Sequence, residues 1–128
     1  MNTCLQLFWN KGVVLIPLNI KQTKNPIIKF FRFLNAYKRI TNSVNSIDIV
    51  HLNILFPFGV FVLYQKLIYK TPFIISEHWT GYIKSIKASY LQKFISKIIS
   101  RNAFKICPVS NQLKDGMESF GLKGNYSV

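Results

Sequence analysis

The sequence predicts an α/β fold: a Rossmann-like parallel sheet flanked by helices. Residues 48–53 and 72–76 are short and apolar, as strands covered on both faces are. Between them, apolar residues recur at spacings of three and four from Val60 to Ile68, which is typical of a helix. Two buried strands joined by a helix are nearly always parallel, with a right-handed crossover. We therefore expect both strands to end at the same edge of the sheet.

Further helices are expected on both sides of this unit. Residues 27–40 are rich in aromatic and apolar residues. Residues 86–101 have an expected inner stripe of Leu91, Phe94, Ile95, Ile98 and Ile99. Residues 104–109 read as another strand, followed by a helix over 111–120 that Ser110 has the chemistry to cap.

The two ends of the chain predict less. Residues 13–18 read as a strand, and Pro17 near its end suits an edge strand or a strand terminus. Only eleven residues precede Gly12, which opens this segment, and they are too few for a complete strand and helix. We therefore expect the usual first βα unit of a doubly wound domain to be missing. Residues 126–128 read as the start of one more strand.

Charge is the unusual feature of the composition. Seventeen Lys and Arg residues against four acidic residues give a net charge of +13, which indicates an anionic partner such as acidic lipid, phosphorylated substrate or nucleic acid. Biased codon usage would give the same composition without a partner. No block of five or six like charges occurs, which argues against a nucleic-acid arm. The basic, aromatic helix at 27–40 either lies in a membrane surface or packs its rings on the sheet.

Length and cysteine usage exclude several classes of protein. A chain of 128 residues suits one domain, and no apolar run reaches the roughly 18 residues that a bilayer span requires. The N-terminus lacks the pattern of a secretory signal. Cys4 and Cys107 lie far apart, with no second Cys or His at metal spacing near either. The sequence thus predicts reduced thiols in the cytoplasm, with neither a metal site nor a bound cofactor.

Candidate site residues follow the predicted strands. His51 and Asn53 belong to the end of one strand, and Glu77 and His78 to the end of the next. Open α/β sheets bind ligands along this edge. His78 could donate to a substrate hydroxyl or exchange a proton, or it could pair with Glu77 and tie the loop. His51, inside its strand, equally suits a hydrogen-bonded core histidine.

Three further residues near this edge have two readings each. Trp79 and Tyr82 could stack on a sugar or base, or simply pack in the loop. Ser110 is better explained as a helix cap than as a nucleophile, because no histidine lies near it in sequence. The N-terminus of the helix that it caps could still hold a phosphate.

Three blocks carry a family resemblance: DIVHLN, PFIISEHWTGY and RNAFKICPVSNQLKDGMESFGLKGNYSV. In this order they resemble the N-terminal half of retaining glycosyltransferases of family 4, which have the GT-B fold, over roughly residues 20–128. The resemblance implies two Rossmann-like domains that face each other across a cleft. The C-terminal domain would bind the nucleotide-sugar, and the N-terminal domain would bind the acceptor. It also implies a catalytic role for His78 and substrate contacts for His51, Asn53, Glu77, Trp79, Ser110 and Asn111.

Departures from the family pattern define the expected gaps. The chain has neither a glycine-rich loop nor two glutamates in E-x7-E spacing. We therefore expect residues 1–128 to form a partial acceptor domain that lacks its first βα unit and the donor domain, and is inactive alone because transfer needs both walls of the cleft. The donor substrate would be a nucleotide-sugar and the acceptor a lipid-linked or polysaccharide precursor of the cell envelope.

The resemblance also suggests a place for the chain, with two alternatives left open. Its basic helices would dock on anionic lipid at the inner face of the plasma membrane. One alternative is a non-catalytic basic α/β module that binds anionic lipid or nucleic acid. The other is the inactive remnant of a broken gene.

Overall fold

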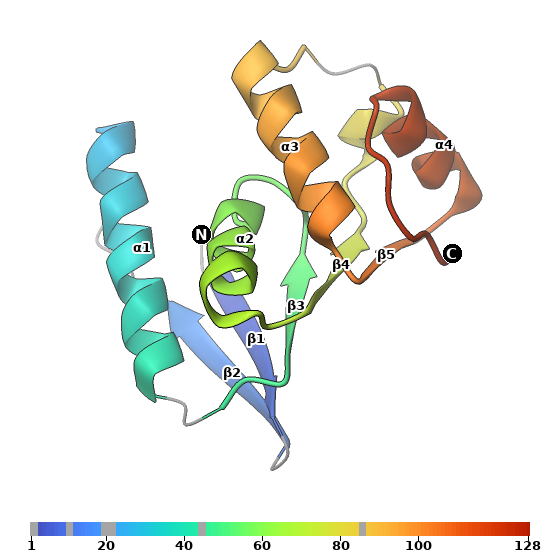
Figure 1. The fold of residues 1–128 in the computed structure, drawn as a ribbon. Coiled ribbons are helices and arrows are strands. Elements are labelled where there is room, and N and C mark those ends of the chain that lie inside the picture. The colour runs from blue at the N-terminus through green and yellow to red at the C-terminus, as the bar shows by residue number, and fades with distance from the viewer. Residues whose placement is uncertain (1–2, 10–11, 19–22, 44–45, 85–86) are drawn as a thin grey trace.

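Five strands form one mixed sheet in the order β2-β1-β3-β4-β5 (Figure 1). The structure, a computed structural model, describes residues 3–9, 12–18, 23–43, 46–84 and 87–128, with side chains from Thr23 onward. Strands β3 (Ile49–Asn53), β4 (Phe73–Glu77) and β5 (Lys105–Pro108) are parallel neighbours. The predicted α/β class and the parallel arrangement of these three strands are confirmed.

The N-terminal part of the sheet is a hairpin. Strands β1 (Thr3–Trp9) and β2 (Gly12–Leu18) pair antiparallel, and β1 also pairs antiparallel with β3. The edge position expected for β2 is confirmed, whereas β1 was not predicted. Eleven residues are too few for a strand and a helix, but they hold one strand and a tight turn, because antiparallel neighbours need no crossover helix.

Four α-helices accompany the sheet within the described residues: α1 (Pro26–Ser43), α2 (Gly59–Tyr69), α3 (Tyr90–Asn102) and α4 (Asn111–Ser119). α1 runs three residues past its expected end at residue 40. α3 begins four residues later than expected, where the Ser89 side chain accepts a hydrogen bond from the Gln92 amide. α2 ends before Lys70, which has a left-handed conformation (φ 61°). The Lys-Thr-Pro sequence predicted the end of the helix at this place, because the residue before a proline is disfavoured in a helix. Among the described residues, no helix has the length and apolar character needed to cross a bilayer.

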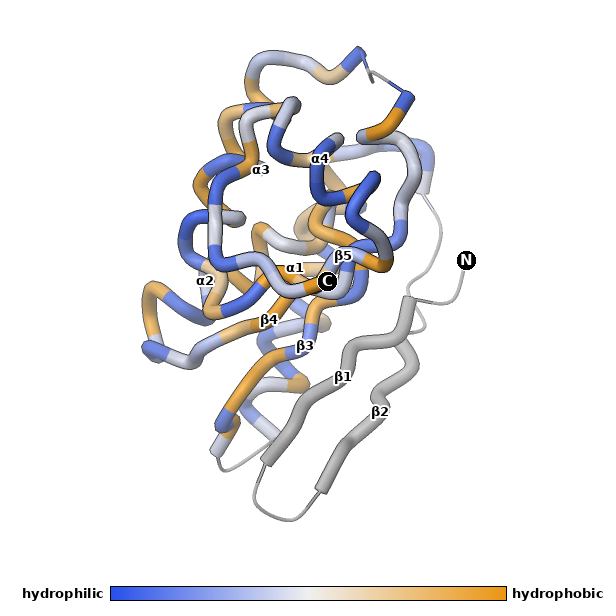
Figure 2. Tube along the Cα trace, turned by 90° about the vertical axis from the view of Figure 1, so that its right-hand side faces the viewer, coloured by the Kyte–Doolittle hydropathy of each residue, from blue (hydrophilic) through white to orange (hydrophobic). Residues whose placement is uncertain are grey.

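The two faces of β3, β4 and β5 differ in burial. One face is almost completely buried, with Val50, Phe73, Ile75 and Ile106 at 0 % exposure. The alternate positions, among them His51, Ile74, Ser76, Lys105 and Cys107, are half-buried. Figures 1 and 2 show α2 and α3 on one side of these strands. The expectation that the strand at residues 48–53, which is β3, is covered on both faces is therefore wrong for the described part of the chain.

Aromatic rings join α1 to α2. The Phe30, Phe33 and Tyr37 rings lie 5.4, 6.3 and 5.9 Å from the ring of Phe61 on α2. These three rings of α1 thus pack on a neighbouring helix. Ile27 and Phe31 of the same helix are 65 and 55 % exposed.

α3 is rotated relative to its expected orientation. Its buried residues are Ser96, Ile99 and Ser100, while Leu91 and Phe94 of the expected inner stripe are 67 and 62 % exposed. On its buried side α3 approaches α2 closely, since a Cβ added at Gly59 would lie 3.0 Å from the Ile99 side chain.

The C-terminal elements follow the prediction closely. Leu113 and Met117 form the buried side of α4, and Gly121 has φ +92°, which suits glycine after a helix. Tyr126 forms a parallel bridge with Ile106 of β5, so the predicted strand start at residues 126–128 lies beside the sheet.

Candidate functional site

The ends of β3, β4 and β5 meet at one edge of the sheet. In the parallel register Asn53 lies opposite Ser76, and Glu77 lies opposite Pro108. Asn53, His78 and Ser110 therefore follow neighbouring strands at the same edge, as the sequence predicted. We call this edge, from Asn53 through His78 and Trp79 to Ser110 and Asn111, the strand-end rim.

Glu77 is fully buried, and its carboxylate accepts hydrogen bonds from backbone amides of the segments that follow β3 and β4. One carboxylate oxygen accepts from the Leu55 amide at 2.9 Å. The other accepts from the amides of His78 and Trp79 at 3.1 and 2.9 Å. The carboxylate faces inward at 0 % exposure and holds the backbone of the rim through these three hydrogen bonds. The substrate contact of Glu77 stays a prediction.

The loop that Glu77 holds contains a strained residue. Ile54 has φ 72°, in the left-handed region where a β-branched side chain is a rare outlier. The Ile54 amide donates to the Ser76 carbonyl at 3.0 Å, and the next amide, of Leu55, donates to Glu77. Two bonds from β4 thus hold the turn that follows Asn53. Sequence reasoning missed both residues of this turn, because neither Ile nor Leu signals a positive φ or a buried amide.

His51 lies on the half-buried face of the sheet. Its Nε2 lies 2.7 Å from the Ser76 hydroxyl on the neighbouring strand. Burial lowers the pKa of His51, which favours the neutral ring at pH 7. The side chain of His51, two residues before the end of β3, is thus tied to Ser76 of β4. Ser76, which the sequence analysis passed over, is its partner.

His78 and Trp79 are the exposed side chains of the rim at the end of β4. His78 is exposed, and Trp79 is 40 % exposed. The Trp79 ring packs over Gly81, where an added Cβ would lie 2.5 Å from it, and meets the Tyr82 ring edge-on at 5.3 Å. The indole is therefore held by its own loop and still offers part of its surface to a ligand.

Tyr82 is not available for stacking on a ligand. It is 6 % exposed and packs edge-on against Phe120 at 5.3 Å between ring centroids. Burial, reinforced by the charge of Glu77, raises the pKa of its hydroxyl. Of the two readings of this residue, packing in the loop is the one that the structure has.

Ser110 caps α4, as predicted. Its hydroxyl oxygen accepts from the Leu113 amide at 3.2 Å, and its backbone is extended. Asn111 follows as the first residue of the helix and is exposed. The half-buried Ser110 and the start of α4 complete the rim beside β5.

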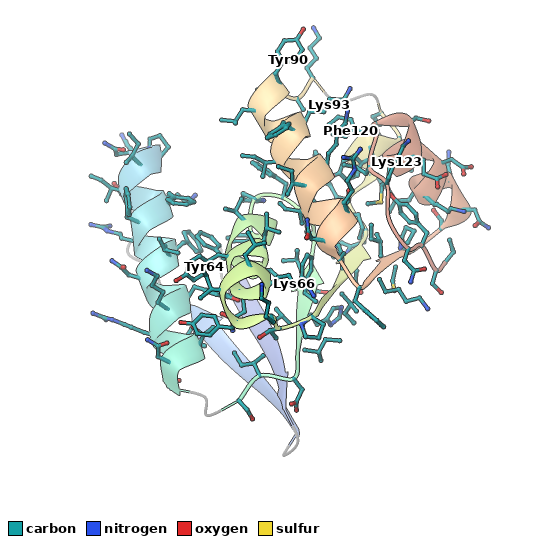
Figure 3. All side chains as sticks on the ribbon, viewed as in Figure 1. Tyr64, Lys66, Tyr90, Lys93, Phe120 and Lys123 are labelled. Atoms are coloured by element: carbon teal, nitrogen blue, oxygen red, sulfur yellow. The ribbon has the colours of Figure 1, made fainter. Side chains whose placement is uncertain are left out.

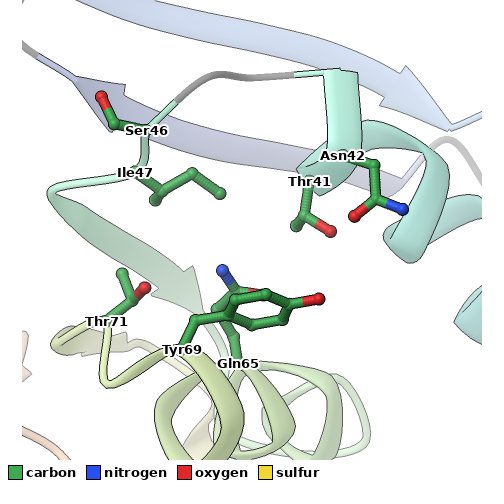
Figure 4. A pocket seen from close by; sticks show the side chains of 7 residues that line it. All are labelled: Thr41, Asn42, Ser46, Ile47, Gln65, Tyr69 and Thr71. Atoms are coloured by element: carbon green, nitrogen blue, oxygen red, sulfur yellow. The ribbon is translucent and has the colours of Figure 1, made fainter.

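A separate pocket lies at the other end of the strands. It has a volume of about 540 Å³ and lies between the ends of α1 and α2 and the segments that enter β3 and β4, lined by Thr41, Asn42, Ser46, Ile47, Gln65, Tyr69 and Thr71 (Figure 4). Within the described residues, the buried Gln65 Oε1 has no hydrogen-bond partner. Because none of the rim residues lines this pocket, it is distinct from the candidate site.

The described part of the chain contains no cluster of metal-ligating side chains. No group of three or more His, Cys, Asp or Glu side chains lies together there. Cys107 is a free thiol, and the Cys4 side chain lies outside the described residues. The chemistry of the rim is that of an imidazole, an indole, amides and a capped helix start.

Comparison with known proteins gives one match. The family model for glycosyltransferase family 4 matches residues 7–128. Searches of curated proteins and of solved structures found no match. The matched range includes the hairpin strand β2, all three parallel strands and the whole strand-end rim.

Proposed function

The chain belongs to glycosyltransferase family 4, and we propose that its strand-end rim is the acceptor wall of a cleft in which a sugar passes from a nucleotide-sugar to an acceptor hydroxyl. The acceptor is a lipid-linked or polysaccharide precursor of the cell envelope. The transferred sugar keeps its anomeric configuration. A nucleotide-sugar is the donor substrate, and no cofactor takes part.

One observation carries this proposal: an exposed imidazole stands at the end of a central parallel strand, on a backbone held by a buried carboxylate. His78 is exposed, while its own amide donates to Glu77 at 3.1 Å. A side chain fixed in this way keeps its place when a substrate binds, which is what positioning catalysis requires. The open-edge location is also where parallel α/β sheets bind ligands.

The rim residues have separate roles in the proposed reaction. The bond between the anomeric carbon and the diphosphate oxygen breaks, the acceptor oxygen forms the new bond to that carbon, and the proton of the acceptor hydroxyl passes to the departing diphosphate. His78 hydrogen-bonds a hydroxyl of the sugar in transit, since imidazole is a donor and acceptor near neutral pH. The exposed part of Trp79 stacks on a sugar ring. Asn53 and Asn111 supply amide contacts, and the start of α4 beside Ser110 favours a negatively charged acceptor group.

Donor binding is assigned to a second domain of the family. The cleft wall formed by that domain would hold the diphosphate and stabilise its developing charge. Residues 1–128 are basic, but they contain no glycine-rich phosphate loop for this task. We therefore expect the isolated chain to bind acceptor without turnover.

The proposal is tested with the chain fused to a family 4 donor domain. The fusion is incubated with a membrane lipid extract and a set of nucleotide-sugars labelled in the sugar, and label in the lipid phase is measured. His78→Ala is expected to lower the transfer rate about a hundredfold, because one hydrogen bond made in the transition state is lost. Lys123→Ala, an exposed change in the turn after α4, is the matched control and should leave the rate unchanged.

Two results would contradict the proposal. Equal rates for His78→Ala and the unaltered fusion would remove His78 from the site. Tight lipid binding without any transferred label, in a fusion whose donor domain still binds nucleotide-sugar, would favour a non-catalytic lipid-binding module instead.

A further inference from the structure

The pocket between the ends of α1 and α2 is built from four separate segments of the chain. Thr41 and Asn42 belong to the last turn of α1, and Gln65 and Tyr69 to the second half of α2 (Figure 4). The segments that lead into β3 and β4 complete its lining. We call this space the α1–α2 pocket. Its volume of about 540 Å³ lies within the roughly 300–1,000 Å³ of small-molecule sites.

Gln65 places a buried amide in this pocket. The residue is only 4 % exposed, and within the described residues its Oε1 has no hydrogen-bond partner. A polar atom buried without a partner lowers stability, so such atoms are rare in folded domains and each needs an explanation. Figure 4 shows the Gln65 amide reaching into the pocket beside the Tyr69 ring. A ligand that forms hydrogen bonds with this amide supplies the explanation.

The pocket offers a ligand both donors and acceptors. The amide nitrogen of Gln65 donates and its oxygen accepts, and the torsion that turns the amide is soft, so either end can meet a ligand. Thr41 adds a second buried group. Its hydroxyl donates to the Tyr37 and Lys38 carbonyls at 3.1 and 3.2 Å, which leaves the hydroxyl oxygen able to accept.

The described lining of the α1–α2 pocket is polar but carries no charge. Its seven residues are three with aliphatic hydroxyls, two with amides, one tyrosine and one isoleucine. An anionic ligand would find no cation among them, although the chain has a net charge of +13. A ligand with a large apolar surface would also fit poorly, since pockets for such ligands are lined mainly by hydrophobic side chains. The lining therefore favours a neutral molecule that is rich in hydroxyl groups.

We infer that the α1–α2 pocket binds a neutral mono- or disaccharide. Sugar hydroxyls both donate and accept, which matches the amides and hydroxyls of the lining. A sugar ring also has an apolar face of C–H groups, and the Tyr69 ring at one wall of the pocket, 54 % exposed, suits that face. A nucleobase stacks between two apolar faces, but the polar Thr41 and Asn42 lie opposite Tyr69 (Figure 4).

The strand-end rim and the α1–α2 pocket lie at opposite ends of β3 and β4. Ile47 and Thr71 of the pocket precede the two strands, whereas Asn53 ends β3 and His78 follows β4. A sugar in the pocket therefore leaves the place of the acceptor open. The inference rests on the pocket and not on sugar transfer, so a failure of label transfer in the fusion would leave it standing.

Titration with sugars, followed by NMR of the isotope-labelled 128-residue chain, tests the inference. The sugars are glucose, galactose, N-acetylglucosamine, maltose and lactose. At least one of them should bind with a millimolar dissociation constant and shift the side-chain amide signals of Gln65 and Asn42. The side-chain amide signal of Gln112, exposed on α4, should stay in place.

Gln65→Leu separates a ligand-binding role from a structural one. Sugar binding should weaken at least about tenfold, because the buried amide is lost. The melting temperature should rise by roughly 2–6 °C, since an apolar group of similar size replaces a buried polar atom without a partner. A glutamine with a purely structural role would instead lose stability when replaced. Gln112→Leu is the matched control and should change neither quantity.

Tyr69→Ala carries the test if circular dichroism shows that Gln65→Leu is not folded. Tyr69 is exposed at the end of α2, so its replacement leaves the core intact. Sugar binding should weaken about fivefold or more, because the ring no longer contacts the sugar. Tyr90→Ala is the matched control, since Tyr90 is 96 % exposed and projects from the start of α3, away from the pocket (Figure 3).

Three results would overturn the inference. The first is a folded chain whose Gln65 and Asn42 signals shift with none of the sugars. The second is sugar binding that His78→Ala abolishes and that Gln65→Leu and Tyr69→Ala leave unchanged, which would assign the sugar to the strand-end rim. The third is binding of adenosine or uridine that requires Gln65 while no sugar binds, which would make the pocket a nucleoside site.

Discussion

Replacing Glu77 tests whether the rim is held by a buried carboxylate. Glu77→Ala removes the acceptor of three backbone amides, from Leu55, His78 and Trp79, at 2.9, 3.1 and 2.9 Å. The residue is 0 % exposed, so the cavity that remains is closed to bulk water. The change therefore leaves donors without partners in the interior of the domain.

The size of the effect follows from the burial of each donor. The Leu55 bond is buried, and an unpaired buried donor costs about 1–3 kcal/mol. The other two bonds are partly buried, so water replaces part of each and we count roughly 0.5–1 kcal/mol apiece. Glu77→Ala should thus lower the free energy of unfolding by about 3 kcal/mol, a large part of the 5–15 kcal/mol typical of a domain.

Urea unfolding followed by circular dichroism measures this loss. With a slope of about 1–3 kcal/mol per molar urea, the midpoint should fall by about 1–3 M. Glu77→Gln should lose nearly as much, because its amide group would place N–H donors against N–H donors. Glu118→Ala, at an exposed position on α4, is the control and should change stability by less than about 0.5 kcal/mol.

The same variants separate a positioning role from substrate binding. A free energy of unfolding for Glu77→Ala within about 0.5 kcal/mol of that of the unaltered chain would refute the positioning role. In the fusion with a donor domain, loss of transfer with unchanged stability would return Glu77 to the substrate-binding set that the sequence suggested.

Two further predictions follow from close packing and from burial. Gly116→Ala should destabilise the domain by about 1 kcal/mol, since overpacking outweighs the better helix propensity of alanine: the new Cβ would lie 3.0 Å from the backbone oxygen of Tyr82. Thermal unfolding measures this, and a higher melting temperature would contradict the packing. The lowered pKa of His51 means that the unfolded chain binds its proton more readily, so stability should fall as pH drops below about 6.5. His51→Asn should flatten that slope between about pH 7 and 5, with His78→Asn as control, and an unchanged slope would show that another group causes it.

The sequence alone determined the parallel unit and its edge. Apolar segments of strand length, joined by a helix with apolar residues at spacings of three and four, require parallel strands and hence a shared edge for Asn53, His78 and Ser110. Local chemistry also sufficed for the Ser110 cap and for the end of α2 before Pro72. These features depend on residues close together in the chain.

Only the tertiary structure decided which way the side chains of the rim and of α3 face. Glu77 turns inward because the Leu55 amide, 22 residues away in sequence, offers it a buried partner. Ile99 of α3 is buried beside Gly59 of α2, while Phe94 of the same expected stripe is 62 % exposed. The hairpin strand β1 forms because β3 and β2 are both there to pair with it. Each outcome depends on a partner distant in sequence, which periodicity and spacing do not register.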